Sequence, residues 1–350
     1  MSTSRALRSL AAAAAALALA AGCTRAGGSD EPVAQAQGPA AEVRLGYFPN
    51  VTHAPAVIGH KKEFYAKELG STKLSVTTFN AGPEEVNALL GESLDIGFIG
   101  SGPAINAFTK SNGTIQLVSG AVSAGAQLVT RPEITSIDQL AGKSIATPSL
   151  GNTQDVALKK LITEKNLPDV RITNLDNPKT LDAFRKGELD GAWLPEPWSS
   201  RLVLDAGAKV LLDEKSLWPG GRFPTTVIIV RQEFLRQYPQ TVQAILRGHV
   251  NAIEWAKGNA ADAKKVVNDT LRQLTGNSLS EPVLDSSFTA IELTTDPIAS
   301  TFPQLAKDSV TAGIVKSAAD LKGFADLSAL NEALRATGKP AVDAAGLDQK

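Results

Sequence analysis

The feature that most constrains the fold is the regular alternation of short apolar segments with helical segments from residue 42 onward. Eight segments have the length and β-branched content of buried strands: 43–48, 73–79, 95–100, 114–120, 143–148, 170–175, 189–194 and 227–231. Helical periodicity is found at 55–69, 83–91, 103–110, 153–162, 178–186 and 198–206, and in longer segments at 239–257 and 260–274. This alternation predicts parallel βαβ units and an α/β fold.

Length and composition limit the class of protein. The chain has 350 residues, about twice the usual length of one domain, so we expect two lobes. Hydrophobic residues make up 43% of the chain, which is enough for a globular core. The formal net charge is −1, and no block of basic residues occurs. Nucleic acid is therefore not an expected partner.

Two stretches of the chain share one plan. Residues 80–100 and 177–195 each begin with Asn and a nearby Pro, continue as an amphipathic helix, and then read Gly-Glu, Leu-Asp and a strand. Asp95 and Asp190 occupy the matching positions. Two lobes built on similar strand–helix units would produce this internal similarity. The strand–helix alternation common to all α/β proteins could also produce it.

The first 41 residues are not expected to belong to the fold. Arg5 and Arg8 precede an apolar run, 10–21, which has the length of a signal-peptide core and is too short to span a bilayer. The run ends at Cys23, the only cysteine, in a pattern that resembles a bacterial lipoprotein signal. We expect 1–22 to be a signal peptide and Cys23 to be lipidated; a secretory signal with a stray cysteine is the alternative.

Residues 23–41 are predicted to form a flexible tether. The segment is small, polar and rich in Gly and Pro, so it buries too little apolar surface to fold. Removal of the signal peptide would leave 33 basic and 36 acidic residues, a formal charge of −3.

Candidate site residues lie in the loops that follow strands, because open α/β sheets bind ligands beyond the carboxyl ends of their strands. Loop 47–55 carries Asn50, Thr52 and His53. Asn50 or Thr52 could instead cap the next helix. Loop 100–104 carries Ser101 between Gly100 and Gly102, whose missing side chains would let backbone N–H groups approach a ligand, or would simply permit a tight turn.

The helix start at Asn152 is the third candidate. Asn152 is predicted to be the N-cap, with Asp155 completing a capping-box-like pair. Thr153 and Gln154 make the first turn polar and uncharged, and a helix start with free N–H donors can bind an anion without a cationic side chain.

The fourth candidate loop is 192–200. Trp193 and Trp198 bracket Pro195-Glu196-Pro197, and the prolines are expected to fix the loop so that Glu196 and an indole project. Packing is the alternative role for each Trp. Two of the four tryptophans in one strand-end loop nevertheless favour a site.

No pattern for catalysis is found. The three histidines, His53, His60 and His249, lack metal-ligand spacing, and no G-x-S-x-G motif occurs. We therefore expect no enzyme activity, no metal and no cofactor.

Four segments together resemble the solute-binding proteins of ABC importers for aliphatic sulfonates, taurine and nitrate. They are LGYFPNVTHAPAVIG (45–59), FNAGPEEVNALLGESLDIGFIGSGPAINAF (79–108), LAGKSIATPSLGNTQDVALKKL (140–161) and GELDGAWLPEPWSSRLV (187–203). The resemblance runs from about residue 43 to about residue 255. It implies a two-lobed clamshell of the type II periplasmic-binding-protein kind, with a mixed, mostly parallel sheet in each lobe.

The resemblance also implies a lobe organisation and a site. Lobe one would comprise 42–127 and 226–350, and lobe two 128–225, with the ligand in the cleft between them. The ligand's anionic group would meet the loops at Ser101 and Asn152–Thr153. Glu196 matches the position that meets the ligand's amine in taurine binders.

The function implied is capture of a small organic anion for import. The expected protein is a monomeric, lipid-anchored binding protein on the extracytoplasmic face of the cell membrane, with an ABC permease and an ATPase as partners and an aliphatic sulfonate or taurine as ligand. Alternatives are the same fold binding nitrate, bicarbonate, a phosphonate or a thiamine pyrimidine precursor, an enzyme like the thiamine-pyrimidine synthases, and a receptor module for a signalling protein.

Overall fold

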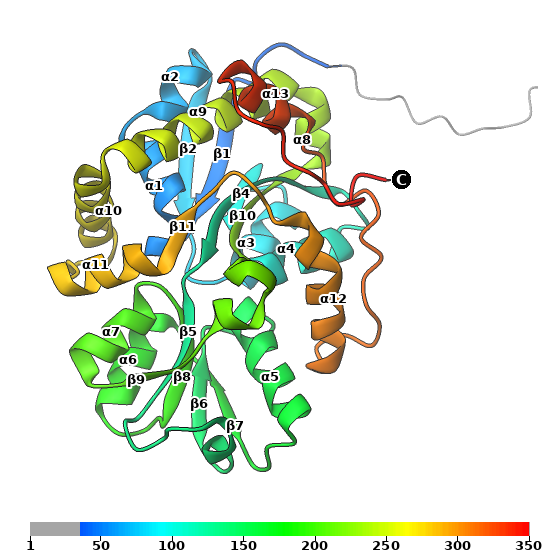
Figure 1. Cartoon of the computed structure of the whole chain (residues 1–350). Helices are drawn as coiled ribbons and strands as arrows, with labels where there is room; N and C mark the ends of the chain where they lie inside the picture. Colours follow the sequence, from blue (N-terminus) through cyan, green and yellow to red (C-terminus); the bar gives the residue numbers. More distant parts are fainter. Residues whose placement is uncertain (1–35, 350) are drawn as a thin grey trace, which may run out of the picture. The chain divides into compact units, whose positions relative to one another are not determined.

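The computed structural model describes residues 36–349, which form two β-sheets packed with helices (Figure 1). The predicted α/β class is confirmed. We call the part of the chain built on the first sheet the first lobe, and the part built on the second sheet the second lobe. Among the described residues, no helix combines the length and the apolar character needed to cross a membrane.

The first sheet has six strands in the order β11-β4-β10-β3-β1-β2. Its strands are β1 (Glu42–Tyr47), β2 (Lys73–Thr78), β3 (Ile96–Ile99), β4 (Ile115–Ala124), β10 (Pro224–Arg231) and β11 (Ile291–Leu293). Strand β1 pairs in parallel with β2 and β3, whereas β10 runs antiparallel to β3 and β4. The sheet is therefore mixed, as predicted.

The second sheet repeats this arrangement with five strands in the order β7-β6-β8-β5-β9. Its strands are β5 (Ala126–Thr130), β6 (Ser144–Thr147), β7 (Arg171–Asn174), β8 (Gly191–Pro195) and β9 (Lys209–Asp213). Strand β6 lies in parallel between β7 and β8, and β5 runs antiparallel to β8 and β9. Each sheet thus has three parallel strands next to one antiparallel strand that enters from the other lobe.

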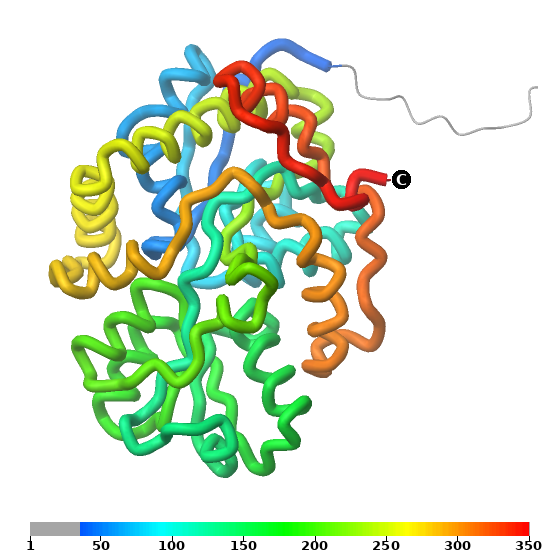
Figure 2. The backbone as a smooth tube through the Cα atoms, viewed as in Figure 1, coloured from blue at the N-terminus to red at the C-terminus, as the bar shows by residue number. Residues whose placement is uncertain are grey.

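Helices follow the strands in the order that the sequence predicts. Those of the first lobe are α1 (Ala54–Lys61), α2 (Phe64–Leu69), α3 (Gly82–Leu90), α4 (Ser101–Lys110), α8 (Gln232–Gln237), α9 (Pro239–Gly258), α10 (Ala260–Thr275), α11 (Glu281–Ala290), α12 (Phe302–Thr311) and α13 (Ser328–Ala336). Those of the second lobe are α5 (Thr153–Lys165), α6 (Asn177–Arg185) and α7 (Trp198–Ala206). The C-terminal helices return to the first lobe, where α9 packs beside α1 and α2 (Figure 2).

One predicted helix is divided in two. The helix expected over 55–69 is interrupted at Glu63, which has a left-handed φ of 60°. The turn brings Tyr65 of α2 back over Gly59 of α1, where a Cβ on the glycine would lie 2.2 Å from the Tyr65 ring. The ring and a glycine at this position are therefore complementary, and the helix direction changes to bury the ring.

Both faces of the second sheet are covered, which decides where its side chains point. Leu128, Ile145 and Trp193 belong to a buried apolar cluster with residues of α5. Their neighbours along the strands belong to a second cluster with residues of α6 and α7. Successive side chains of a strand point to opposite faces, so continuous apolar strands are expected here.

The chain passes between the lobes at two places. Between β4 and β5, Ala124 and Gly125 have φ values of 63° and 79°, and this pair of left-handed residues redirects the chain. The second passage runs from β9 to β10. Strands β5 and β10 begin at Ala126 and Pro224, each two residues before the junctions predicted at 128 and 226.

The last part of the predicted tether is ordered, which differs from the expectation. Ala40 is buried, its N–H donates to Thr241 Oγ1 at 2.9 Å, and its carbonyl accepts from Thr72 Oγ1 at 2.7 Å. The Gln37 N–H donates to the Gln237 carbonyl at 2.7 Å. Long-range partners on α8 and α9 fix a segment that composition alone marks as flexible. The signal peptide and Cys23 lie outside the described residues.

The similarity between residues 80–100 and 177–195 is also found in the structure. Helix α6 and strand β8 begin 95 residues after α3 and β3, as do the two aspartates before the strands. Asp95 Oδ2 accepts from the Arg44 N–H, and its own N–H donates to the Arg44 carbonyl, both at 2.9 Å. Asp190 makes the same pair of bonds with Ser144, both at 2.8 Å. Each aspartate thus ties the start of a central strand to its parallel neighbour.

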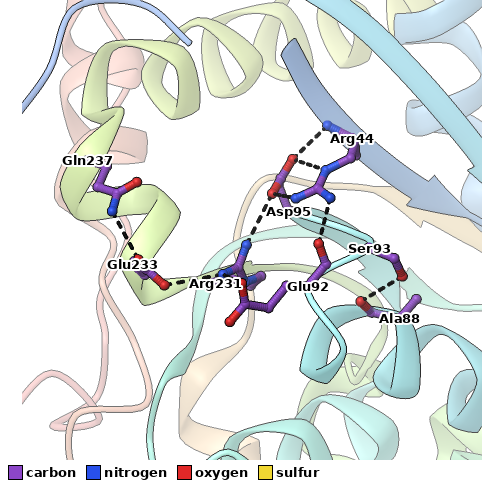
Figure 3. Close-up of polar contacts among 8 residues, drawn as sticks. All are labelled: Arg44, Ala88, Glu92, Ser93, Asp95, Arg231, Glu233 and Gln237. Atoms are coloured by element: carbon purple, nitrogen blue, oxygen red, sulfur yellow. Dashed lines mark hydrogen bonds and ion pairs between the residues drawn. The ribbon is translucent and has the colours of Figure 1, made fainter. Parts of the chain in front are cut away.

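In the first lobe, two arginines also form ion pairs with this aspartate. The guanidinium groups of Arg44 and Arg231 both reach Asp95, and Arg231 also pairs with Glu92 and Glu233 (Figure 3). In the second lobe, the residue that corresponds to Arg44 is Ser144. Asp190 therefore makes the backbone hydrogen bonds without an arginine at that position.

Replacing Asp190 by alanine should lower the free energy of unfolding by about 2 kcal/mol, because the Ser144 N–H loses its acceptor in a partly buried position. Urea denaturation measures the change. Asp182→Ala, on the exposed face of α6, is the matched control and should change the stability by less than about 0.5 kcal/mol. Equal effects of the two substitutions would contradict this role of Asp190.

Candidate functional site

A small polar cavity lies between the lobes at the carboxyl ends of the parallel strands. Its volume is about 20 Å³, enough for about one water molecule. The lining residues are Phe48, Asn50, Thr52, His53, Asn80, Gly100, Pro148, Asn152, Thr153, Gln154, Asn177, Pro195 and Thr225. None of these side chains is acidic or a permanent cation, so the cavity offers only neutral dipoles.

The first turns of two long helices face each other at this cavity. The Gly102 N–H of α4 donates to Thr153 Oγ1 of α5 at 3.2 Å, so the contact joins the two lobes. A Cβ at Gly100 would lie 2.8 Å from Thr153 Oγ1, and one at Gly102 would lie 3.3 Å from Thr153 Cα. Glycine at both positions therefore allows the two helix starts to approach closely, whereas the sequence analysis expected a ligand or a tight turn there.

Converging helix starts produce a positive electrostatic environment. The first N–H groups of a helix have no partner within the helix, and the aligned peptide dipoles place a partial positive charge there. Pro103 removes one donor from α4, which leaves the N–H groups of Ser101 and Gly102 at its start. Together with the first turn of α5, these groups form an arrangement suited to a small anion.

Two buried polar atoms in or next to this cavity have no hydrogen-bond partner among the described residues. Ser101, which follows the lining residue Gly100, is fully buried and its hydroxyl is unpaired, although Ser101 itself is not among the lining residues. The same holds for Oδ1 of Asn177, which lines the cavity from the first turn of α6. An unpaired buried polar group is costly, so these atoms indicate that something polar completes their bonding.

Asn152 is the N-cap of α5, as predicted, but the predicted capping box is wrong. The Asn152 side chain makes no capping hydrogen bond and instead lines the cavity. Asp155 accepts from Thr147 Oγ1, the Gly151 N–H, Asn174 Nδ2 and Lys159 Nζ. Asp155 therefore does not accept from the Asn152 N–H, which donates to the Ser149 carbonyl, and the Asn152 side-chain amide makes no capping bond.

His53 is brought to the cavity as a neutral side chain. Burial lowers the pKa of His53 to about 3. Its Nε2 lies 3.2 Å from the Phe98 carbonyl, which can only accept, so Nε2 carries the proton. Nδ1 lies 3.3 Å from Thr52 Oγ1, and the ring stacks on Phe48. Both ring nitrogens therefore have partners within the protein, and the exposed part of the ring supplies shape.

Asn50 and Trp198 form a contact between the lobes. The Trp198 indole N–H donates to Asn50 Oδ1 at 2.9 Å, and both side chains are buried. Asn50 precedes the 3-10 turn Val51–His53 without a side-chain capping bond. Asn50 lines the cavity, whereas Trp198 stands behind it and orients its amide.

Trp193 does not reach the cavity. It is fully buried beneath α5, and its indole N–H donates to Glu214 Oε2 at 2.9 Å. Glu214 also accepts a hydrogen bond from the Gln154 side chain, and burial raises the pKa of its carboxyl to about 8. Gln154 lines the cavity, so Trp193 and Glu214 support the site from below.

Glu196 lies away from the cavity as well. Its carboxylate accepts from Ser199 Oγ, from the N–H and Oγ of Ser200, and from Ser287 Oγ of α11 at 3.0 Å. The side chain is fully buried, and burial raises its pKa although these hydrogen bonds oppose the shift. Because Ser287 belongs to the first lobe, Glu196 joins the lobes where a ligand contact was predicted.

Three polar residues of the cavity, Asn80, Asn177 and Thr225, were not among the candidates from sequence, and neither was Pro148. Asn177 could have been identified from the sequence, because it begins the helix that follows strand 171–174. Thr225 could not have been identified from its place after a strand. Strand β10 is antiparallel, so its beginning, rather than its end, lies at this edge of the sheet. Within 36–349, no group of three or more His, Cys, Asp or Glu side chains has the geometry to hold a metal.

The fold is the two-lobed α/β fold of the periplasmic-binding-protein kind, with a small polar cavity between the lobes. A family model described as NMT1-like matches residues 36–270. The chain belongs to this family.

The chain is also similar to curated binding proteins in sequence and to solved structures in fold. The taurine-binding periplasmic protein of Escherichia coli (strain K12) is 30% identical over 200 residues, which cover 57% of this chain and 62% of that protein's length. A Bacillus subtilis (strain 168) protein, provisionally named as binding aliphatic sulfonates, is 25% identical over 84% of this chain and 88% of its own. The alkanesulfonate-binding protein SsuA from Xanthomonas axonopodis pv. citri, bound to MOPS, superposes with a TM-score of 0.66 at 19% identity, covering 79% of this chain and 94% of that chain.

Proposed function

We propose that this protein captures a small organic anion, an aliphatic sulfonate or taurine, for an ABC importer. The observation that carries the proposal is the meeting of the α4 and α5 starts at a cavity with neutral lining and a buried, unpaired Ser101 hydroxyl. Two relatives are named for binding taurine and, provisionally, aliphatic sulfonates. These names favour a sulfonate over other anions as the ligand.

A binding site without charged side chains can provide the affinity that a transport protein needs. Micromolar affinity requires about 8 kcal/mol, and each hydrogen bond to a charged group contributes about 1.5–3 kcal/mol. Three or four such bonds from the Ser101 and Thr153 hydroxyls and the helix N–H groups would supply this affinity. A sulfonate is larger than the 20 Å³ cavity, so the ligand would enter when the lobes separate and would replace the Gly102–Thr153 bond.

The remaining parts of the proposal concern location and partners. We propose a signal peptide at 1–22, lipidation of Cys23, a tether that ends before Gln37, and lobes of about 42–127 with 226–350 and of 128–225. The protein would act as a monomer on the extracytoplasmic face of the cell membrane and would deliver its ligand to a permease driven by an ATPase. Nitrate, bicarbonate, a phosphonate and a thiamine pyrimidine precursor are the alternative ligands, and an enzyme like the thiamine-pyrimidine synthases is the alternative activity.

Thermal denaturation with a panel of sodium salts tests the ligand class. A ligand at 100 times its dissociation constant stabilises the protein by about 2.7 kcal/mol, which corresponds to a shift of about 4 °C for a chain of this size. We expect the shift with alkanesulfonates or taurine and not with equal concentrations of sodium chloride.

Thr153→Val tests the site, because it removes one hydroxyl and keeps the shape. Loss of about 1.5–3 kcal/mol of binding free energy should reduce the stabilisation at the same ligand concentration from about 2.7 kcal/mol to between about 0.3 and 1.3 kcal/mol. Thr163→Val, at the exposed end of the same helix, is the control and should retain the full shift. A shift only with nitrate, bicarbonate or a pyrimidine would overturn the proposed ligand, and no shift with any anion would overturn the proposed function.

A further inference from the structure

A second, larger pocket lies directly beside the polar cavity. Its volume is about 320 Å³, within the range of pockets that bind organic ligands. The lining residues are Gly102, Ile105, Asn106, Thr109, Lys110, Leu150, Gly151, Val156, Ala306, Ser309, Ile314, Val315, Ser317 and Ala319. They come from α4, from the start of α5, and from α12 with the segment that follows it. Apolar side chains come from all three elements, and the polar lining residues include one cation, Lys110, so we call this space the apolar pocket for its predominant lining.

The two cavities share one wall. Gly102 lines the apolar pocket, Thr153 lines the polar cavity, and the two residues are joined by a hydrogen bond, so the two spaces lie on either side of this contact. Residues close in sequence line the two spaces. Gly100 and Asn152 line the polar cavity, whereas Gly102 and Gly151 line the apolar pocket. An anionic group seated at the two helix starts would therefore have its remaining atoms at the entrance of the apolar pocket.

Neither space provides a partner for a cationic group. No acidic side chain lines the polar cavity or the apolar pocket. The nearest predicted partner, Glu196, has its carboxylate enclosed by three serines and is fully buried. A ligand that carried an ammonium group into the apolar pocket would leave that charge unpaired, which is strongly unfavourable.

We propose that the apolar pocket holds the hydrocarbon chain of a monoanionic alkanesulfonate whose head group binds at the starts of α4 and α5. This inference rests on the proposed function and specifies its ligand class: a sulfonate with an uncharged chain of several carbons, in preference to taurine or an inorganic anion. Ile105, Val156 and Ile314 are the side chains that contact the hydrocarbon chain.

Thr153 connects head-group binding to opening of the pocket. Its hydroxyl now accepts from the Gly102 N–H. A sulfonate oxygen that accepts from Gly102 in its place frees the Thr153 hydroxyl to donate to a second oxygen of the same group. The wall between the two spaces is then made by the ligand itself, and the carbon attached to sulfur faces the apolar side.

Isothermal titration of the purified protein with methane-, propane- and hexanesulfonate tests the assignment. Each buried CH₂ is expected to strengthen binding about three- to fourfold, because about 0.8 kcal/mol is gained per methylene. Ethanesulfonate should bind more tightly than taurine, which has the same chain length and an added ammonium group.

A filled pocket provides the second test. Ser309 is half-buried on α12 and lines the pocket, so Ser309→Trp should place an indole where the chain would lie. This variant should bind methanesulfonate as the natural protein does and should lose the gain from methane- to hexanesulfonate. Ser309→Ala, the matched control, should keep that gain.

The outcomes separate this inference from the proposed function. Methanesulfonate binding without any gain along the series, or equal binding of taurine and ethanesulfonate, would overturn the chain pocket and leave the anion site intact. A gain that persists in Ser309→Trp would also overturn it, because the chain would then lie elsewhere. Failure of every sulfonate to bind would overturn both.

Discussion

The variant Asn152→Asp should bind its anionic ligand on the order of 100-fold more weakly while folding as stably as the natural protein. Asn152 caps α5 and lines the polar cavity without making a side-chain capping bond. Aspartate has the same shape and is an equally good N-cap, so the helix should not be destabilised. Its negative charge would lie about 5 Å from the bound anion, and repulsion at that distance costs about 3 kcal/mol at an effective dielectric constant of 20.

The comparison with Asn152→Ser separates charge from shape. Serine is also a good N-cap and is neutral, so this variant should lose no more than about tenfold in affinity. Titration with the sulfonate that binds most tightly measures both variants, and urea denaturation checks that both fold normally. Equal affinities of the aspartate and serine variants would mean that the anion does not bind at the start of α5.

Most of the fold could be predicted from the sequence because apolar periodicity reports burial. The strands at 43–48, 73–79, 95–100, 143–148 and 170–175 and the helices after them follow from that pattern. Strands β5, β9 and β11 were not predicted. Strand β11 has three residues, and Ala126–Thr130 follows β4 after a single glycine, so the sequence contains no turn signal of the usual length between two strands.

The candidate site was predicted in part, for a physical reason. Asn50, His53, Asn152, Thr153 and Gln154 all line the cavity, because they follow parallel strands whose carboxyl ends share one edge of a sheet. Ser101 and Gly102 lie at the adjoining helix start. Each of these residues is located by its position in the chain relative to a strand.

The direction of a side chain within a loop is not determined by that position. Glu196 and Trp193 belong to the right loop, yet Glu196 turns toward the serines of α7 and α11 and Trp193 toward the core under α5. In both cases the partner is distant in sequence. A polar or aromatic residue in a strand-end loop is therefore good support for the loop and weak support for its own contact with a ligand.

The largest effect on stability is expected for Glu214→Gln, and it should depend on pH. Glu214 is buried beneath the site, where it accepts from Trp193 and Gln154 and lies near Asp213 and Lys160. Burial raises the pKa of its carboxyl from 4.5 to about 8. In the pH range between these two values the folded protein holds the proton and the unfolded chain does not, so stability falls as the pH rises. Glutamine has no such proton to hold.

The free energy of unfolding of Glu214→Gln should therefore rise relative to that of the natural protein by on the order of 4 kcal/mol between pH 5 and pH 8. Other buried groups, including His53 and Glu85, titrate alike in both proteins and cancel in the difference. Glu188→Gln, exposed in the same lobe, is the control and should show no such rise. A difference that stays constant with pH would mean that Glu214 is ionised in the folded protein, and its charge would then oppose an anion bound above Gln154. A rising difference would mean that the site is kept free of negative charge up to about pH 8.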